Sequence, residues 1–196
     1  MSQTDTRTEV IAASGRLFAE RGIAGTTMRA IAEACDIQAA SLYHHFESKD
    51  DLVAEIMNAS SRHLVGLYEA IAAADLDPIA RFEAIIRATL ENFTQHPDAA
   101  RIFYDNPSYY ATAPSLEQVR SEARFNDRVW VATIDAAIAA GVLRSDIKPS
   151  RLKLHLRNMI WSSARGMRRG RAATDEDADD IVTLLMYGCV VGSLSD

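Results

Sequence analysis

The sequence has few of the residues that cross-link or interrupt a chain. Its 196 residues include only two cysteines, Cys35 and Cys189, which are far apart and show neither CxxC nor Cys/His spacing. This pattern excludes a disulfide framework and a sequence-local zinc site, and it fits a reducing compartment. Only five prolines and nine glycines are present. The composition therefore favours long, uninterrupted helices.

Long apolar runs and an apolar leader are also missing. The apolar stretches are short and interrupted, so none is long enough to span a bilayer. The polar start, MSQTDTRTEV, has no apolar segment behind it of the kind that a secretory signal contains. With 48% hydrophobic and 24% charged residues, the composition is ordinary for a soluble globular protein. We therefore expect a cytoplasmic protein of one domain or two small ones.

An excess of positive charge is missing as well. The formal net charge is −6, whereas nucleic-acid-binding domains are usually basic. Residues 1–50 contain five Lys and Arg against seven Asp and Glu, which gives −2. Any contact with a nucleic acid must therefore depend on a few well-placed cations.

Apolar residues recur with the period of a helix, and no segment alternates as a strand would. In the first predicted helix, 6–21, Val10, Ala13 and Leu17 share one face, and Gly22 should end the helix. Further helices are predicted at about 27–35, 38–46, 48–71, 78–96, 115–140, 149–166 and 174–192, with a short helix after Pro97 and a loop-rich aromatic stretch over 102–115.

Three residue patterns predict local structure inside or before these helices. Gly15 lies in the middle of the first helix, where glycine costs stability, and it indicates close approach by another helix. Thr27 can cap the free N–H groups of the second helix. Ser48 and Asp51 have the spacing of a capping box, with Asp in the acidic place.

The two short helices at 27–35 and 38–46, joined by a tight turn, predict a helix-turn-helix, whose second helix enters the major groove of DNA. Leu42 and Phe46 lie one turn apart and should point into a small core with Leu17, Phe18 and Ile31. The outward side chains are Ala39, Ser41, Tyr43 and His44. Small polar and aromatic side chains suit base edges, thymine methyls and phosphates, and Lys49 at the next helix start could hold a phosphate.

The segment GIAGTTMRAIAEACDIQAASLYHHFESKDDL, residues 22–52, resembles the N-terminal domain of the TetR family of transcriptional regulators. That family shows a Thr-opened helix, Ile-Ala, a turn, Leu-Tyr-x-His/Tyr-Phe and then Ser-Lys-x-x-Leu. Two positions depart from the pattern: Asp36 stands where the turn usually has glycine, and Gln38 where Ser or Thr usually caps the recognition helix. Aspartate enters the left-handed region more readily than most residues, so we expect the turn to be kept and Gln38 to be a poor cap.

The resemblance implies an all-α fold with an N-terminal three-helix helix-turn-helix domain, placed at 1–47, and a larger helical ligand-binding and dimerisation domain, placed at 48–196. It implies a ligand-responsive repressor that binds a pseudo-palindromic double-stranded DNA operator as a homodimer and is released by a small apolar ligand. The expected DNA-binding residues are Thr27, Arg29, Ala39, Ser41, Tyr43, His44 and Lys49. No cofactor or membrane partner is expected. No metal site is expected either, because the neighbouring His44 and His45 point apart and no third ligand is evident.

The second half of the chain predicts an apolar ligand site. Its aromatic residues suggest a pocket as a set; those expected to line it are Phe103, Tyr104, Tyr110, Trp130 and Trp161. Arg165 follows Trp161 by four residues, on the same helical face, and could bind an anionic group of the ligand. The stretch 139–167 is similar to family members that sense acyl-coenzyme A thioesters. The arginines there could instead complement the helix C-terminus and pair with Asp175, Glu176 and Asp177.

The dimer seam is expected along the last two helices, where apolar residues recur at helical spacing; the interface residues are Leu156, Ile160, Leu184 and Leu185. Two other functional classes stay open. One is a helical protein-binding adaptor that does not bind DNA. The other is a small all-helical enzyme, although the sequence shows no Ser/His/Asp, phosphate-loop or paired-carboxylate pattern.

Overall fold

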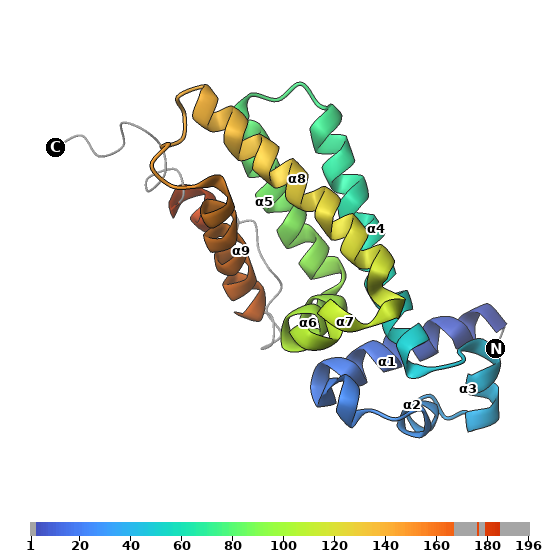
Figure 1. Cartoon of the computed structure of the whole chain (residues 1–196). Coiled ribbons are helices and arrows are strands. Elements are labelled where there is room, and N and C mark those ends of the chain that lie inside the picture. The colour runs from blue at the N-terminus through green and yellow to red at the C-terminus, as the bar shows by residue number, and fades with distance from the viewer. Residues whose placement is uncertain (1–2, 167–175, 177–178, 185–196) are drawn as a thin grey trace. The chain divides into compact units, whose positions relative to one another are not determined.

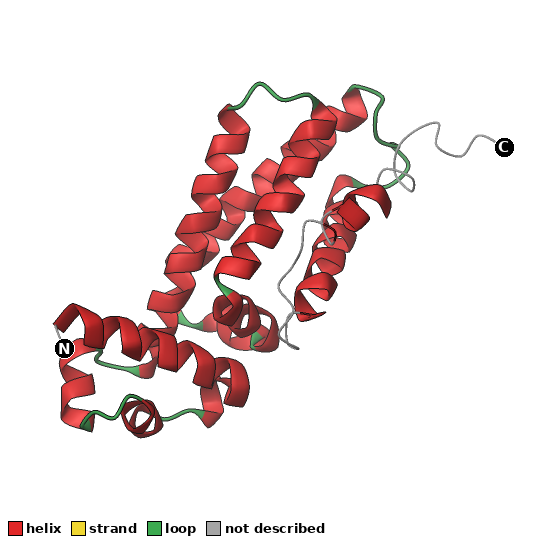
Figure 2. Cartoon of the chain, turned by 180° about the vertical axis from the view of Figure 1, so that it is seen from behind, coloured by secondary structure: helices red, strands yellow, loops and turns green. Residues whose placement is uncertain are grey.

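The computed structural model describes residues 3–166, 176 and 179–184 (Figure 1). The regular structure of this part of the chain is helical, without a β-strand (Figure 2), as predicted. The elements are α1 (Gln3–Gly25), α2 (Met28–Ala34), α3 (Ala39–His45), α4 (Lys49–Ala73), α5 (Pro78–Gln95), α6 (Pro97–Asp105), α7 (Pro107–Thr112), the 3-10 helix η1 (Pro114–Leu116), α8 (Glu117–Ala139) and α9 (Pro149–Gly166). Residues 179–184 are also helical.

The helix ends near the N-terminus follow the predicted signals. Gly22 has a φ of 75° and interrupts the helical geometry of α1. The hydroxyl of Thr27 accepts a hydrogen bond from the N–H of Ala30 at 3.1 Å and caps α2. Asp36 takes a φ of 52° in the turn before α3, a conformation that glycine adopts most easily. Gln38 makes no side-chain capping bond to α3, so this helix begins without that stabilisation.

The stretch 102–115 differs from the prediction, because it is mostly helical rather than loop-rich. Pro97, Pro107 and Pro114 each stand in the first turn of α6, α7 or η1. Proline is tolerated there, since the N–H that it lacks has no partner inside the helix. These prolines therefore begin short helices and do not leave loops.

The described helices fall into two compact units, which do not follow chain order. The first contains the residues up to 62 together with 96–122, and the second contains 63–95 and the chain from 123 onward. The first unit has its own apolar core, in which Leu17, Phe18, Ile31, Leu42 and Phe46 are all buried, as predicted. The second core includes Tyr68, Phe82, Ile134 and Leu156. The predicted boundary between a DNA-binding domain at 1–47 and a ligand-binding domain at 48–196 concerns function, and it stays a prediction.

Gly15 marks a close approach between α1 and α6 in the first unit. A Cβ atom at this position would lie 2.8 Å from Oδ2 and 3.1 Å from Cβ of Asp98 on α6. Arg101, one turn further along α6, donates to the carbonyl oxygen of Ala19 at 2.5 Å. The absence of a side chain at Gly15 therefore lets α6 pack against α1, as its mid-helix position predicted.

None of the helices in the described ranges is both long enough and apolar enough to cross a membrane.

Candidate nucleic-acid interface

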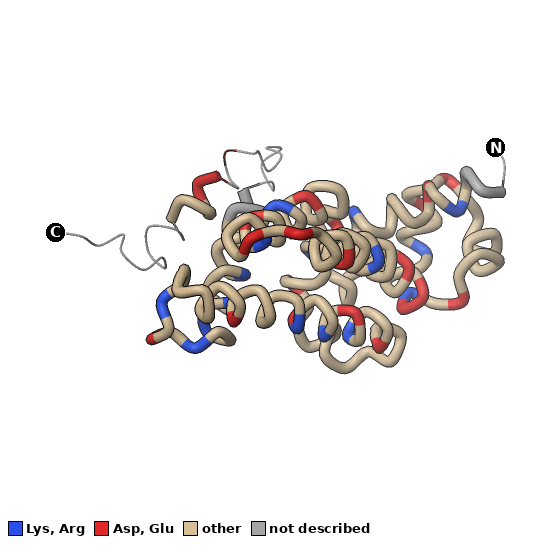
Figure 3. Tube along the Cα trace, turned by 90° about the horizontal axis from the view of Figure 1, so that it is seen from above, with Lys and Arg blue, Asp and Glu red and all other residues tan. Residues whose placement is uncertain are grey.

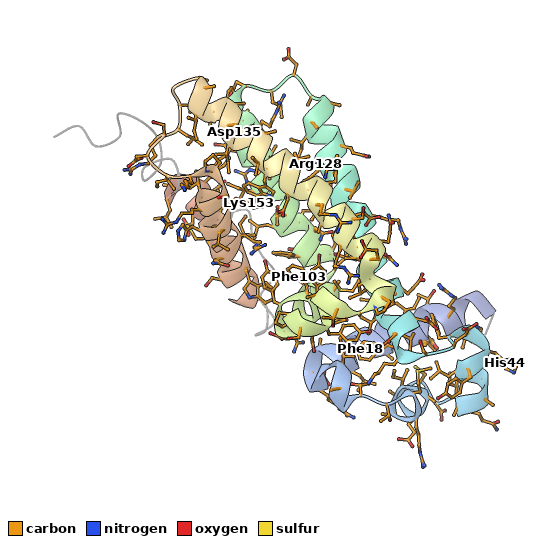
Figure 4. The ribbon with its side chains drawn as sticks, in the orientation of Figure 1. Phe18, His44, Phe103, Arg128, Asp135 and Lys153 are labelled. Carbon is orange, nitrogen blue, oxygen red and sulfur yellow. The ribbon has the colours of Figure 1, made fainter. Side chains whose placement is uncertain are left out.

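The side chains of α3 divide into a buried face and an exposed face. Leu42 is fully buried, whereas Tyr43, the next residue, is 54% exposed. Ala39 and His44 are exposed and Ser41 is half-buried, and Figure 4 shows His44 at the outer edge of the α3 ribbon. The four predicted base-reading residues thus lie on one short helix, away from the core.

The two predicted contacts on and before α2 have different surroundings. The hydroxyl of Thr27 already accepts the capping bond from Ala30. Arg29 is exposed and donates from Nε to Oε1 of Glu33 at 2.8 Å, a hydrogen bond that raises the pKa of the guanidinium. An ion pair this exposed contributes little, so Arg29 can exchange Glu33 for a phosphate at small cost.

Lys49 makes contacts that the sequence did not predict. Its ammonium donates to the carbonyl oxygens of Ile23 at 2.6 Å and of Thr26 at 3.1 Å. Ile23 belongs to the last residues of α1, after the interruption at Gly22, and Thr26 follows α1. Lys49 therefore connects the start of α4 to the segment that leads into the helix-turn-helix. Next to it, Ser48 and Asp51 exchange the two predicted capping-box hydrogen bonds, at 3.0 and 3.1 Å.

A second contact at the start of α4 is made by a residue of α7. The hydroxyl of Tyr109 donates to Oδ1 of Asp50 at 2.6 Å. Burial, followed by the contact with Asp50, raises the pKa of Tyr109. Arg120 on α8 donates to the carbonyl oxygens of Tyr110 at 2.9 Å and Ala113 at 2.8 Å, at and just beyond the end of α7. Sequence reasoning did not predict these contacts, because the partners are distant in the chain or are backbone atoms.

Charge alone does not identify this surface. Figure 3 shows Lys and Arg positions interleaved with Asp and Glu along the N-terminal helices. Arg7, for example, pairs with Glu55 at 3.2 Å. The geometry of α3, rather than a basic patch, is what suits this unit to DNA.

The residues predicted to bind a ligand lie in both units. Phe103, Tyr104 and Tyr110 belong to the first, where the Phe103 ring meets Tyr104 and Tyr110 edge to face, with centroids 4.8 and 4.5 Å apart. Trp130 and Trp161 belong to the second. The three rings of the first unit are half-buried and form one aromatic cluster.

In the second unit, Trp130 is buried and meets Phe82 edge to face, with ring centroids 6.0 Å apart. Trp161 on α9 is half-buried and meets Phe93 in the same way, at 6.0 Å. The backbone of Arg165 belongs to α9, but its side chain lies outside the described part of the structure.

The residues predicted to form the dimer interface differ in how exposed their side chains are. Leu156 and Ile160 have no exposed surface in the single chain, because they pack in the core of the second unit. Leu184 is 63% exposed, and Leu154 on α9, which sequence reasoning did not select, is 43% exposed. Leu185 lies outside the described residues. Within the described ranges, Leu154 and Leu184 are thus the leucines with large exposed side chains.

Comparison with known proteins covers almost the whole chain. The family model for bacterial regulatory proteins of the tetR family matches residues 10–56, and that for the tetracyclin repressor-like C-terminal domain matches residues 75–189. The chain is 33% identical over 186 residues to the HTH-type transcriptional repressor KstR2 of Rhodococcus jostii, covering 93% of this chain and 90% of that protein.

Two solved structures have the same fold. The ketosteroid transcriptional regulator KstR2 of Mycobacterium tuberculosis superposes with a TM-score of 0.88 at 25% identity, over 97% of each chain. AibR, solved in complex with isovaleryl coenzyme A and operator DNA, superposes with a TM-score of 0.76 at 21% identity, over 92% of this chain and 98% of that one.

The motif at 22–52, the helix-turn-helix built on it and these similarities agree. The C-terminal match alone spans more than half of the chain, and relatives similar over most of its length are repressors. The protein-binding adaptor and the enzyme are therefore no longer needed as explanations. The chain belongs to the TetR family and is a DNA-binding, ligand-responsive transcriptional regulator.

Proposed function

We propose that the protein acts in the cytoplasm as a homodimeric repressor that binds a pseudo-palindromic operator through α3 and leaves it when a small apolar ligand binds. The observation that carries this proposal is the exposed face of α3, with Tyr43 and His44 directed away from the buried Leu42. A helix that packs one face against a core and exposes the opposite face can enter the major groove of DNA.

On this proposal the DNA contacts divide into two kinds. Ala39, Ser41, Tyr43 and His44 meet base edges and thymine methyls from α3, where sequence can be distinguished. Thr27, Arg29 and Lys49 meet phosphates and fix the register of the helix on the duplex. Two N–H groups of the Lys49 ammonium bind carbonyls, which leaves the third for a phosphate oxygen.

The dimer is proposed to form along the last two helices. Exposed Leu154 and Leu184 supply apolar surface there, and buried Leu156 and Ile160 hold α9 in place behind it. Leu185 is proposed as a further contact. Two copies related by a twofold axis would place their α3 helices about 34–36 Å apart, or a multiple of this, to match half-sites one helical turn apart.

The ligand is proposed to be an apolar acid carried as an acyl-coenzyme A thioester. Within the second unit, Trp130 and Trp161 supply apolar surface, and Arg165 supplies the cation for an anionic end. Among the similar proteins, one is a ketosteroid transcriptional regulator, and another was solved in complex with isovaleryl coenzyme A. Such a ligand releases DNA only if it prefers the form that cannot bind the operator.

Release of DNA by defined thioesters tests this proposal. A fluorescent duplex from the DNA upstream of the gene is bound by the protein and titrated with acetyl-, isovaleryl- and decanoyl-coenzyme A while anisotropy is measured. The longer thioesters should release DNA. Arg165→Ala should need roughly tenfold more thioester, the usual cost of a lost charge-assisted hydrogen bond.

The matched control is Arg151→Ala, an exposed arginine at the start of the same helix, which should respond as the wild type does. If Arg165→Ala lowers the melting temperature and leaves release unchanged, the arginine pairs with the acids after residue 174 and is not a ligand contact. If free neutral hydrophobic compounds release the wild type and thioesters do not, the acidic ligand is wrong.

A further inference from the structure

The second unit contains a chain of buried polar side chains that bridges three helices. Nε1 of Trp130 on α8 donates to the hydroxyl oxygen of Tyr68 on α4 at 2.7 Å. That hydroxyl lies 2.7 Å from Oγ1 of Thr89 on α5, which itself donates to the carbonyl oxygen of Ile85 at 2.7 Å. Because the Thr89 proton is used in this way, the Tyr68 hydroxyl must donate to Thr89. The hydrogen bonds that link Trp130, Tyr68 and Thr89 are therefore all formed without a ligand.

A second polar level lies one helical turn away. Nδ1 of His63 on α4 and Oδ1 of Asn92 on α5 are 3.1 Å apart. In this unit α5 runs antiparallel to α4, and α8 runs in the direction of α4 (Figure 1). Asn126 precedes Trp130 by four residues, so it lies on the same face of α8, about 6 Å closer to the level of His63 and Asn92.

Asn126 differs from Trp130, Tyr68 and Thr89 because its amide oxygen lacks a donor among the described residues. The residue is only 9% exposed, and Oδ1 receives no hydrogen bond from the described residues. Asn92, which is 3% exposed, has His63 as its partner. Buried acceptors in folded proteins are nearly always paired, and an unpaired one loses its hydration without compensation. An asparagine at this position therefore destabilises the unliganded fold.

We propose that Oδ1 of Asn126 accepts a hydrogen bond from the effector, so that the effector carries a hydroxyl group on its otherwise apolar body. The inference rests on the proposed function, in that it takes the second unit as the part that binds an apolar effector. A site built to hydrogen-bond one ligand group rejects the analogue that lacks it, because the buried protein group is then left unpaired. Asn126 thus selects hydroxylated ligands over saturated or keto analogues of the same size.

The first arm of the test needs no ligand. Asn126→Leu replaces an unpaired amide with an apolar side chain of similar volume, and the melting temperature of the free protein should rise by about 2–4 °C. The control, Asn92→Leu, removes the partner of His63 and should lower the melting temperature. A fall in the melting temperature of Asn126→Leu would show that the amide stabilises the free fold, and it would overturn the inference.

The second arm uses matched ligands in two series. One series is 3-hydroxydecanoyl-, 3-oxodecanoyl- and decanoyl-coenzyme A, and the other is 2-decanol, 2-decanone and decane. Binding is read from the shift in melting temperature and from DNA release. Wild type should favour the hydroxylated member of a series by about five- to tenfold, the contribution of one hydrogen bond, and Asn126→Leu should lose this preference while binding operator DNA normally.

The outcomes separate this inference from the proposed function. If thioesters release DNA with no regard to the hydroxyl group, the thioester ligand stands and the role of Asn126 is wrong. If only the alcohol series shows a preference that depends on Asn126, the role of Asn126 stands and the thioester is wrong. If wild type prefers the hydroxylated member in neither series, the inference is overturned.

Discussion

At the scale of single residues, Lys49 illustrates how one side chain can serve both fold and function. The sequence motif places it at a phosphate, whereas the structure places its ammonium on the carbonyl oxygens of Ile23 and Thr26. These roles are compatible, because an ammonium has three donors. A lysine that holds the segment before α2 would also hold the reading helix at the correct distance from the phosphate that it binds.

Lys49→Met keeps the length of the stem and removes all three donors. We expect a lower melting temperature, because two partly buried carbonyls lose their donor, and weaker binding to specific and random DNA alike. The slope of log K against log salt should become shallower by about 0.9 for each phosphate contact that is lost. An unchanged slope with a lower melting temperature would limit Lys49 to its structural role.

At the scale of elements, α6 is joined to α1 by a contact that depends on Gly15. Gly66 on α4 provides the matched comparison, because a Cβ atom there would meet nothing within 4 Å. Gly15→Val should lower the free energy of unfolding by about 1–3 kcal/mol, the usual cost of overpacking. Gly66→Val should change it by less than about 0.5 kcal/mol. Urea denaturation followed by circular dichroism measures both, and equal effects would contradict the close approach of α6.

The same contact gives α6 a dependence on pH. Burial raises the pKa of Asp98, and the nearby Arg101 and Arg16 only partly offset this effect. A raised pKa in the folded state means that the proton favours folding, so this stabilisation is present at acid pH and is lost as the pH rises through the folded pKa.

Asp98→Asn should therefore raise the melting temperature relative to wild type at about pH 7.5, and lose this advantage at about pH 3, where even an ordinary aspartate is largely protonated. Thermal denaturation of the two proteins across this range provides the comparison. A variant less stable than wild type at neutral pH would show that the charge of Asp98 is needed by Arg101 or Arg16.

At the scale of the whole molecule, local signals predicted the helices better than the contacts between them. The cap at Thr27, the box at Ser48 and Asp51 and the left-handed turn at Asp36 depend on neighbours in sequence, and each was found. The bond from Trp130 to Tyr68 joins residues 62 positions apart, and no local pattern encodes it. No local pattern shows either that α6 and α7 group with α1 and not with α5. The predicted ligand residues therefore divide between two units, which the sequence did not indicate.

The central claim is that the exposed face of α3 reads DNA, and anisotropy with DNA from upstream of the gene tests it most directly. Wild type should bind this DNA with a dissociation constant of about 10⁻⁸ M or below and random DNA far more weakly. Asp135→Ala, an exposed change on α8, should bind as wild type does. Tyr43→Ala should bind the upstream DNA at least about tenfold more weakly with an unchanged melting temperature, because its side chain leaves the core intact. Equal affinity of Tyr43→Ala and wild type, or equal binding of wild type to upstream and random DNA, would contradict the account.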